Sequence, residues 1–358
     1  MSAEAKKRIE FIDLAKGLCI FLVVLAHVMS SFDLENYPLR DAMGMFRMPL
    51  YFFLSGLFFS TYENYRGFLK RKTNKLLIPF LAWYLLTVAI PVNVAALLGK
   101  NGYGGFQSLI DFIWPERIFY NGAIWFLWGL FIMNNIFYGI YLLSHRLSQK
   151  HMVALICLFS LLVGCAGYAL FRPLRINLPA NIDSAMTALP FFVAGYLFRR
   201  YTNLLQPNKY DKYNWLFVIL FFAVVILLAR YVNYRRNQYS VDIFSLYAGG
   251  LLGTLGIILL SKILKKLPLL SYCGRYSIMI LVIHVLVIKA VKPLILHFCS
   301  GTVSILLTLL VAFGVSALLI PVMKKFLPHI TAQKDLIPIN SHMGTGPIGQ
   351  NVSTERKN

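Results

Sequence analysis

The sequence has few charged residues, and acidic ones are the scarcest. Charged side chains make up 14% of its 358 residues, against roughly 25% in typical soluble proteins. Only 14 residues are Asp or Glu, whereas hydrophobic residues reach 58%. This composition excludes a disordered chain and a coiled coil, and it makes a soluble enzyme improbable. The class that remains is a polytopic membrane protein.

Cysteine is also scarce, and its placement excludes a small disulfide-stapled scaffold. Each of the five cysteines lies inside or at the edge of an apolar run, where a free thiol behaves as a small packing residue. The first apolar stretch has no small-residue cleavage site and contains Asp13 and Lys16. We therefore interpret it as a retained helix and not as a signal peptide.

Ten apolar runs approach the length of about 20 residues that a helix needs to cross a bilayer. They are residues 12–31, 42–60, 76–98, 122–143, 152–170, 184–199, 214–231, 242–261, 275–296 and 301–323. No segment between them is long enough for a large soluble domain. We predict an all-α, polytopic membrane domain of about ten helices over residues 1–330. A polar, disordered cytoplasmic tail is expected over residues 331–358.

Basic residues are abundant, and their distribution predicts the topology. There are 35 Lys and Arg, giving a net charge of +21, which in a soluble protein would suggest nucleic acid. Here they form short clusters between apolar runs, and 23 of them fall on one set of alternate loops against eight on the other. The positive-inside rule then places both termini in the cytoplasm. We expect an inner-membrane protein whose surroundings are lipids, with no nucleic-acid partner.

Several ionisable residues lie inside the predicted spans, where burial is costly and function is the usual reason. They are Asp13, Lys16, His27, Arg47, His284, Lys289 and Lys292. At about 1.5 Å per residue, His27 and Arg47 both fall roughly 20 Å above the inner face, which predicts a polar cavity in the outer half. Structural roles stay open for an Asp13–Lys16 ion pair and for His284 as an interhelical hydrogen-bonding residue. Neither histidine has a carboxylate or thiol at ligand spacing, so no metal site is predicted.

Four motifs, in order along the chain, resemble those of the membrane-bound acyltransferase 3 family. They are Asp13-Leu14-Ala15-Lys16-Gly17 followed by His27, Phe46-Arg47-Met48-Pro49 leading to Ser55-Gly56, Arg71-Lys72-Thr73-Asn74-Lys75, and Gly122-Ala123-Ile124-Trp125-Phe126-Leu127. Asp183 and the Tyr276 to His284 stretch also match in order and spacing. Lys16 and Lys75 stand where the family usually has Arg. The first departure resembles the branch of fucose 4-O-acetylases.

The resemblance implies a ten-helix enzyme that transfers an acyl group, usually acetyl, from cytoplasmic acyl-CoA to a hydroxyl of a sugar, a cell-surface polysaccharide or a lipid-linked glycan. Acyl-CoA would be a co-substrate, with no bound cofactor. The expected catalytic residues are His27 and Arg47, and the expected acyl-CoA-binding residues are Lys16, Arg71 and Lys75. Acceptor or cavity residues would be Asp13, Trp125, Asp183, His284 and Lys289.

The chemistry of these residues suits that reaction independently. A sugar hydroxyl needs a base with a pKa near neutrality, which histidine supplies, and a cation such as Arg47 can stabilise the oxyanion formed on a thioester. His27 is expected to act as general base in direct transfer, with an acyl-imidazole intermediate as the alternative. The basic run 66–75 fits either CoA phosphates or anionic lipid headgroups. An O-succinyltransferase of the same family and a flippase for lipid-linked sugars are the competing functions.

Overall fold

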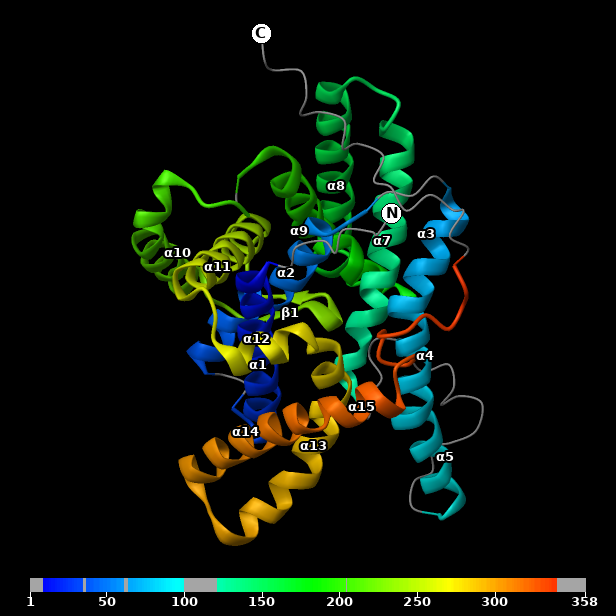
Figure 1. Ribbon diagram of the computed structural model, residues 1–358, viewed down its shortest axis with the longest axis vertical. Helices are drawn as coiled ribbons and strands as arrows, with labels where there is room; N and C mark the ends of the chain where they lie inside the picture. Colours follow the sequence, from blue (N-terminus) through cyan, green and yellow to red (C-terminus); the bar gives the residue numbers. More distant parts are fainter. Residues whose placement is uncertain (1–8, 35–36, 61–63, 100–120, 204, 340–358) are drawn as a thin grey trace, which may run out of the picture.

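The computed structural model describes residues 9–34, 37–60, 64–99, 121–203 and 205–339. Most of these residues are helical (Figure 1). The α-helices are α1 (Glu10–Ser31), α2 (Pro38–Leu57), α3 (Tyr65–Lys72), α4 (Ile78–Tyr84), α5 (Ile90–Leu97), α7 (Trp125–Ser144), α8 (Gln149–Phe171), α9 (Ile182–Tyr201), α10 (Asn214–Leu228), α11 (Ile243–Leu264), α12 (Pro268–Arg275), α13 (Ser277–Phe298), α14 (Gly301–Leu318) and α15 (Ile320–Phe326). The prediction of an all-α, polytopic membrane protein is confirmed.

Every predicted span corresponds to a helix. Eight helical segments in the described part of the chain are long and apolar enough to cross a membrane. The other two predicted spans are α2 and α9, each 20 residues long and therefore able to cover about 30 Å. Both helices are less hydrophobic than the eight, and they are among the helices packed against several neighbours. Asp183 of α9 is buried in protein, whereas Arg199 and Arg200 are exposed at the end of that helix.

Two prolines shape the third span, which runs along one edge of the molecule as α3, α4 and α5 (Figure 1). Wide π turns over Thr73–Leu77 and Leu85–Ala89 join these helices. Each π turn comes shortly before a proline, Pro79 or Pro91. Because proline has no N–H for the carbonyl four residues earlier, it favours such an interruption. Short π segments are frequent at functional sites, and the first of them contains Asn74 and Lys75.

Glycines allow two pairs of helices to approach at backbone distance. A Cβ atom at Gly56 of α2 would lie 1.8 Å from the Phe192 carbonyl oxygen of α9. A Cβ atom at Gly17 of α1 would lie 1.9 Å from the Leu270 carbonyl oxygen of α12. Small residues at such crossings are the common means of tight packing between membrane helices. The glycines of the first two sequence motifs therefore fix how α1 and α2 sit in the bundle.

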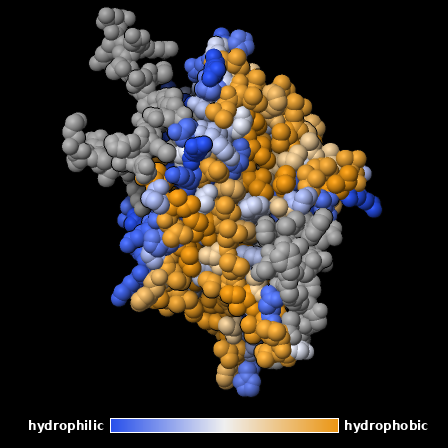
Figure 2. Space-filling view, turned by 90° about the vertical axis from the view of Figure 1, so that its right-hand side faces the viewer, coloured by the Kyte–Doolittle hydropathy of each residue, from blue (hydrophilic) through white to orange (hydrophobic). Residues whose placement is uncertain are grey.

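The outer surface is largely apolar. Figure 2 shows hydrophobic residues over most of one face, with hydrophilic residues gathered toward its edges. Leu227 of α10 and Phe298 of α13 are 75% and 82% exposed. In water such a surface would be unfavourable, but in a bilayer it contacts acyl chains. The structure thus fits a multi-pass membrane protein.

Two short segments add to the helices. Strands β1 (Val232–Asn233) and β2 (Gln238–Tyr239) form an antiparallel hairpin between α10 and α11. Past α15, the chain continues as a packed segment in which Thr331 is fully buried. The expectation of a disordered tail therefore does not hold for residues 331–339, because their backbone groups find partners on the third span. Residues 340–358 lie outside the described residues.

Candidate active site

Two histidines from different helices meet in the interior. The rings of His27 on α1 and His284 on α13 have centroids 5.0 Å apart and planes inclined by 59°. His284 is fully buried, whereas His27 keeps part of its surface accessible. Helices α1 and α13 pack directly against each other, which brings the pair together. Of the two rings, His27 is the one that a substrate can reach.

A backbone contact fixes the tautomer of His284. Its Nδ1 atom lies 2.9 Å from the carbonyl oxygen of Ile280. Because a carbonyl can only accept, Nδ1 carries the proton and Nε2 keeps its lone pair. That Nε2 atom is buried and has no hydrogen-bond partner among the described residues. His284 therefore offers a fixed acceptor beside His27.

Arginines surround the histidine pair. Arg47 on α2, Arg40 near the start of α2 and Arg235 in the hairpin are all close enough for their charge to act on His27. The Nη1 atom of Arg47 is buried without a hydrogen-bond partner in the described part of the chain. Arg47 is thus within electrostatic reach of His27, and a shared role of the two residues stays a prediction. Sequence reasoning places Arg40 and Arg235 in outer loops and misses that their charges also reach His27.

The hairpin between α10 and α11 delivers Arg235. Its backbone carbonyl accepts a hydrogen bond from Asn181 Nδ2 at 2.5 Å, and a Cβ atom at Gly122 would lie 2.6 Å from its Nη1 atom. Glycine at position 122 therefore leaves room for the guanidinium. Burial lowers the pKa of Arg235 to about 10, so the side chain stays a cation at neutral pH. A basic residue in an outer loop, where positive charge is rare, was the available signal.

A cavity of about 490 Å³ opens at the other end of the bundle. Its polar lining includes four basic residues, Lys16, Lys72, Lys75 and Arg275. Deeper residues are mostly apolar or aromatic, including Phe126 and Leu281. Four cations around one opening favour an anionic ligand. The apolar interior favours a ligand that also has a thin, uncharged arm.

The cavity approaches the histidine pair along two helices. Leu281 lines it on α13, and His284 is one turn further, a rise of roughly 4.5 Å. Tyr51 lines it on α2, and Arg47 is one turn away toward the histidines. The hydroxyl of Tyr51 donates to the Lys16 carbonyl oxygen at 3.2 Å, which ties α2 to α1 at the cavity wall. On α2 and α13, the cavity lining therefore ends about one helical turn from Arg47 and His284.

The structure brings together two of the three residues expected to bind acyl-CoA. Lys16 and Lys75 both line the cavity, although they come from different spans. Arg71 is exposed and does not line it. Lys72 and Arg275 line it instead, and sequence reasoning missed both of them. Lys72 lies in the same basic run as Arg71, but only the helical turn decides which of the two side chains faces inward.

The residues expected around the acceptor are divided among several places. The Asp13 carboxylate is 3.8 Å from Arg275, which lines the basic opening. Trp125 is buried against Phe126, a cavity residue, with ring centroids 6.3 Å apart. Asp183 is buried below the hairpin, where Oδ1 accepts from the Ser184 amide. Lys289 is exposed five residues beyond His284.

Lys292, the second lysine of α13, contacts the end of α1. The Lys292 ammonium group donates to the Ser31 carbonyl oxygen and covers the Phe32 ring at 4.6 Å. It therefore closes the outer end of α1. No three His, Cys, Asp or Glu side chains come together in the described residues, and the absence of a metal site stays a prediction.

Comparison with protein families matches residues 9–322 to the acyltransferase domain family. The chain belongs to the acyltransferase 3 family. The match covers every span from α1 to α14 and confirms the resemblance drawn from the motifs. Nodulation protein NolL of Sinorhizobium fredii is 27% identical over 254 residues, covering 67% of this chain and 62% of NolL. The chain thus matches less than two thirds of that relative's length. No solved structure matches it.

The position of the acyltransferase 3 motifs explains their residue types. Gly17 and Gly56 permit the two close helix crossings. The charge of Arg47 acts on His27, and Lys16 and Lys75 line the basic opening. Motifs that lie far apart in the sequence therefore meet in the folded bundle.

Proposed function

We propose that this protein is an inner-membrane O-acyltransferase that moves an acetyl group from cytoplasmic acetyl-CoA to a hydroxyl of a glycan. The observation that carries the proposal is a basic cavity whose lining ends about one helical turn from His284. A donor with several phosphates and a thin acyl-bearing arm matches the basic opening and the apolar lining of that cavity. The acceptor is a sugar, a cell-surface polysaccharide or a lipid-linked glycan.

The donor would bind with its phosphates at Lys16, Lys72, Lys75 and Arg275. Lysine ammonium groups act as point charges toward phosphate, and Arg275 adds a planar fork. The arm of the donor would then extend between Phe126 and Leu281 toward His284. The loops rich in Lys and Arg are expected on the cytoplasmic side of the membrane. The basic opening belongs to those loops, so it would face the compartment that contains CoA.

The acyl transfer itself would take place at His27. Its imidazole removes the proton of the acceptor hydroxyl as the oxygen attacks the thioester carbonyl, and the CoA thiolate leaves toward the basic opening. Arg47 stabilises the oxyanion of the tetrahedral intermediate. The lone pair on His284 Nε2 orients His27 or the acceptor hydroxyl. We prefer direct transfer to an acyl-imidazole intermediate because it needs no second half-reaction.

The acceptor would enter from the outer side. Arg40 and Arg235 approach the histidines from the loops at that end, and guanidinium groups donate well to sugar hydroxyls and acidic substituents. Donor and acceptor would then meet at His27 from opposite faces of the membrane. This arrangement lets a cytoplasmic donor modify a glycan outside.

An assay of CoA release from acetyl-CoA tests the proposal. Purified full-length protein in detergent is incubated with labelled acetyl-CoA, with and without a glycan extract, and released CoA is measured. Lys16→Gln removes one charge-assisted contact, worth about 1.5–3 kcal/mol, so the apparent acetyl-CoA constant should rise roughly ten-fold or more. Arg146→Gln is the control, because Arg146 is exposed and does not line the cavity.

The outcomes separate the competing functions. Glycan-dependent CoA release supports O-acetyl transfer, and faster release from succinyl-CoA would instead assign an O-succinyltransferase. Movement of a lipid-linked sugar across vesicles with no CoA release would identify a flippase. An equal acetyl-CoA constant for Lys16→Gln and the control would remove the cavity from the donor site.

A further inference from the structure

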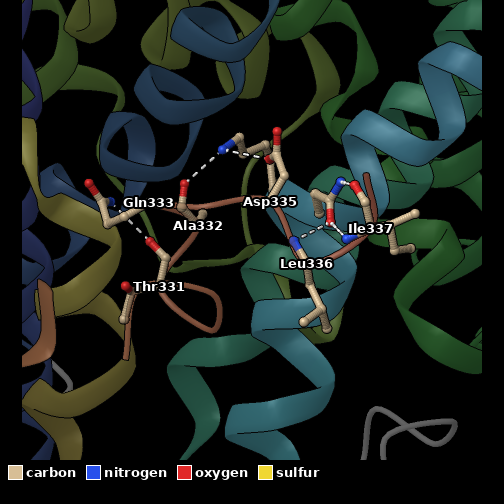
Figure 3. A network of polar contacts seen from close by, with 8 residues as sticks. Thr331, Ala332, Gln333, Asp335, Leu336 and Ile337 are labelled. Carbon is tan, nitrogen blue, oxygen red and sulfur yellow. Dashed lines mark hydrogen bonds and ion pairs between the residues drawn. The ribbon is translucent and has the colours of Figure 1, made fainter. Parts of the chain in front are cut away.

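A C-terminal segment, residues 327–339, lies against the third span beside the basic opening (Figure 3). Two side chains of the third span donate hydrogen bonds to backbone carbonyl oxygens of this segment. Trp83 Nε1 donates to the Ile330 carbonyl oxygen at 2.9 Å, and Lys75 Nζ donates to the Ala332 carbonyl oxygen at 3.0 Å. The segment therefore contacts α4 and the π turn Thr73–Leu77, whose Lys75 lines the cavity.

The Asn74 side chain binds only backbone groups of this segment. Its Oδ1 atom accepts from the amides of Leu336 at 3.0 Å and Ile337 at 2.8 Å. Its Nδ2 atom donates to the Ile337 carbonyl oxygen at 2.8 Å. Asn74 is only 1% exposed, and buried polar bonds of this kind are costly to break. Docking of the segment at this point does not depend on its own side chains.

Asp335 is the acidic side chain that the segment brings to the opening. Its Oδ1 atom is 2.9 Å from Lys75 Nζ, and the two side chains are 37% and 35% exposed. Lys75 also lines the cavity. Lys75 thus lines the cavity and also pairs with a carboxylate of the chain itself.

We propose that Asp335 is a further residue of the donor site, which holds Lys75 at the opening and gives it up to a phosphate of the incoming acyl-CoA. The inference rests on the proposed function, because it assigns a residue to the same donor site. Lys75 exchanges one anionic partner for another, and no covalent bond changes. The segment stays docked during the exchange, since Asn74 binds its backbone independently of Asp335.

The strength of the two contacts favours this exchange. A partly exposed ion pair such as Lys75–Asp335 is weak, whereas phosphate carries more charge and more acceptor oxygens. Lys75 therefore binds the donor phosphate in preference to the carboxylate, but the phosphate must first displace that carboxylate. Asp335 lowers the affinity for the donor by competing with it, and it prevents weaker anions from occupying the opening.

Calorimetric titration of the full-length protein in detergent with CoA tests the exchange. Asp335→Asn should lower the CoA dissociation constant by roughly two- to five-fold, the range set by a partly exposed ion pair. Glu10→Gln is the matched control. Glu10 forms a comparable exposed pair with Lys266 at 3.1 Å, and neither of those residues lines the cavity. This control should leave the constant unchanged.

A second background keeps the test specific. In a Lys75→Gln protein the substitution Asp335→Asn should have no further effect, because the contested cation is gone. Asp335→Glu keeps the charge and should bind CoA as the unmodified protein does. Size-exclusion profiles identify any variant that fails to fold. If Asp335→Asn does not fold, Asp335→Glu is compared with the unmodified protein, and the two should have the same CoA dissociation constant.

Each outcome has a defined meaning. Tighter CoA binding that depends on Lys75 supports the exchange. An unchanged constant for Asp335→Asn, or equal tightening with Glu10→Gln, overturns it while leaving the proposed function intact. Absence of CoA binding by the unmodified protein overturns both the exchange and the donor site.

Discussion

At the scale of single residues, the two histidines differ in ways that assign them different tasks. His27 is partly accessible, and His284 is fully buried with its Nδ1 proton committed to Ile280. An accessible imidazole can take a proton from an entering hydroxyl, whereas a buried one with a fixed tautomer is suited to orientation. His27 is therefore the expected base.

Substituting each histidine separately tests this assignment. His27→Ala should lower turnover by roughly 100-fold or more, the usual contribution of a general base, and the protein should remain folded. His284→Ala should cost about ten-fold, because it removes only an orienting acceptor. Labelled acetyl transfer with matched protein amounts measures both. A larger loss at His284 would place the base on α13.

Charged residues illustrate the limits of a local reading. Asp13 and Lys16 are one turn apart, and the sequence alone leaves a pair between them open. In the folded chain the Asp13 carboxylate approaches Arg275 of α12, and the Lys16 ammonium group lies over the Phe58 ring at 5.3 Å. Residues distant in the sequence therefore decide which side chains face the cavity.

At the scale of helices, backbone crossings at glycine position the site. α2 and α9 meet at Gly56, and each carries residues of the outer half, such as Arg47 and Asp183. α1 and α12 meet at Gly17, so the crossing also sets the distance between Lys16 and Arg275. A side chain at either glycine would force the two helices apart.

Gly56→Leu should therefore destabilise the protein strongly. Its Cβ atom would fall 1.8 Å from a backbone oxygen of α9, and such overpacking costs about 3 kcal/mol or more. Gly139→Ala in α7 is the control, because no atom lies within 4 Å of the added carbon and helix propensity improves. Thermal unfolding in detergent compares them. Equal midpoints would show that the crossing tolerates a side chain.

At the scale of the whole molecule, the apolar surface and the division of charge place the chain in a bilayer. Exposed leucines and phenylalanines cover its sides, and the basic opening belongs to the loops that carry most of the Lys and Arg residues. The proposed reaction requires this opening to face the cytoplasm. Orientation in the membrane is therefore part of the mechanism.

Cysteine labelling tests the orientation. In a background without the five native cysteines, Arg66→Cys on α3 and Arg236→Cys in the hairpin provide exposed positions at opposite ends. An impermeant maleimide added to intact cells should label position 236 and leave position 66 unlabelled. Permeabilised cells should show both. Labelling of position 66 alone in intact cells would reverse the topology and the donor side.

The sequence by itself determined the class of fold and the reaction family. Hydropathy is a local property, and about 20 apolar residues form a spanning helix wherever it packs. The ten predicted spans therefore all correspond to helices, and the motifs around His27 and Arg47 identified the family. Among the predicted spans, α2 and α9 have lower hydropathy than the others, and the Asp183 side chain of α9 is buried in protein.

Tertiary structure decided which residues share a site. The meeting of His27 with His284, the burial of Arg235 beside Gly122 and the pairing of Lys75 with Asp335 each join segments that no sequence period connects. Arg71 and Lys72 are neighbours, yet only Lys72 faces the cavity. Such contacts depend on helix rotation, on close glycine crossings and on loop paths, because short-range patterns specify helices but not the way in which they pack.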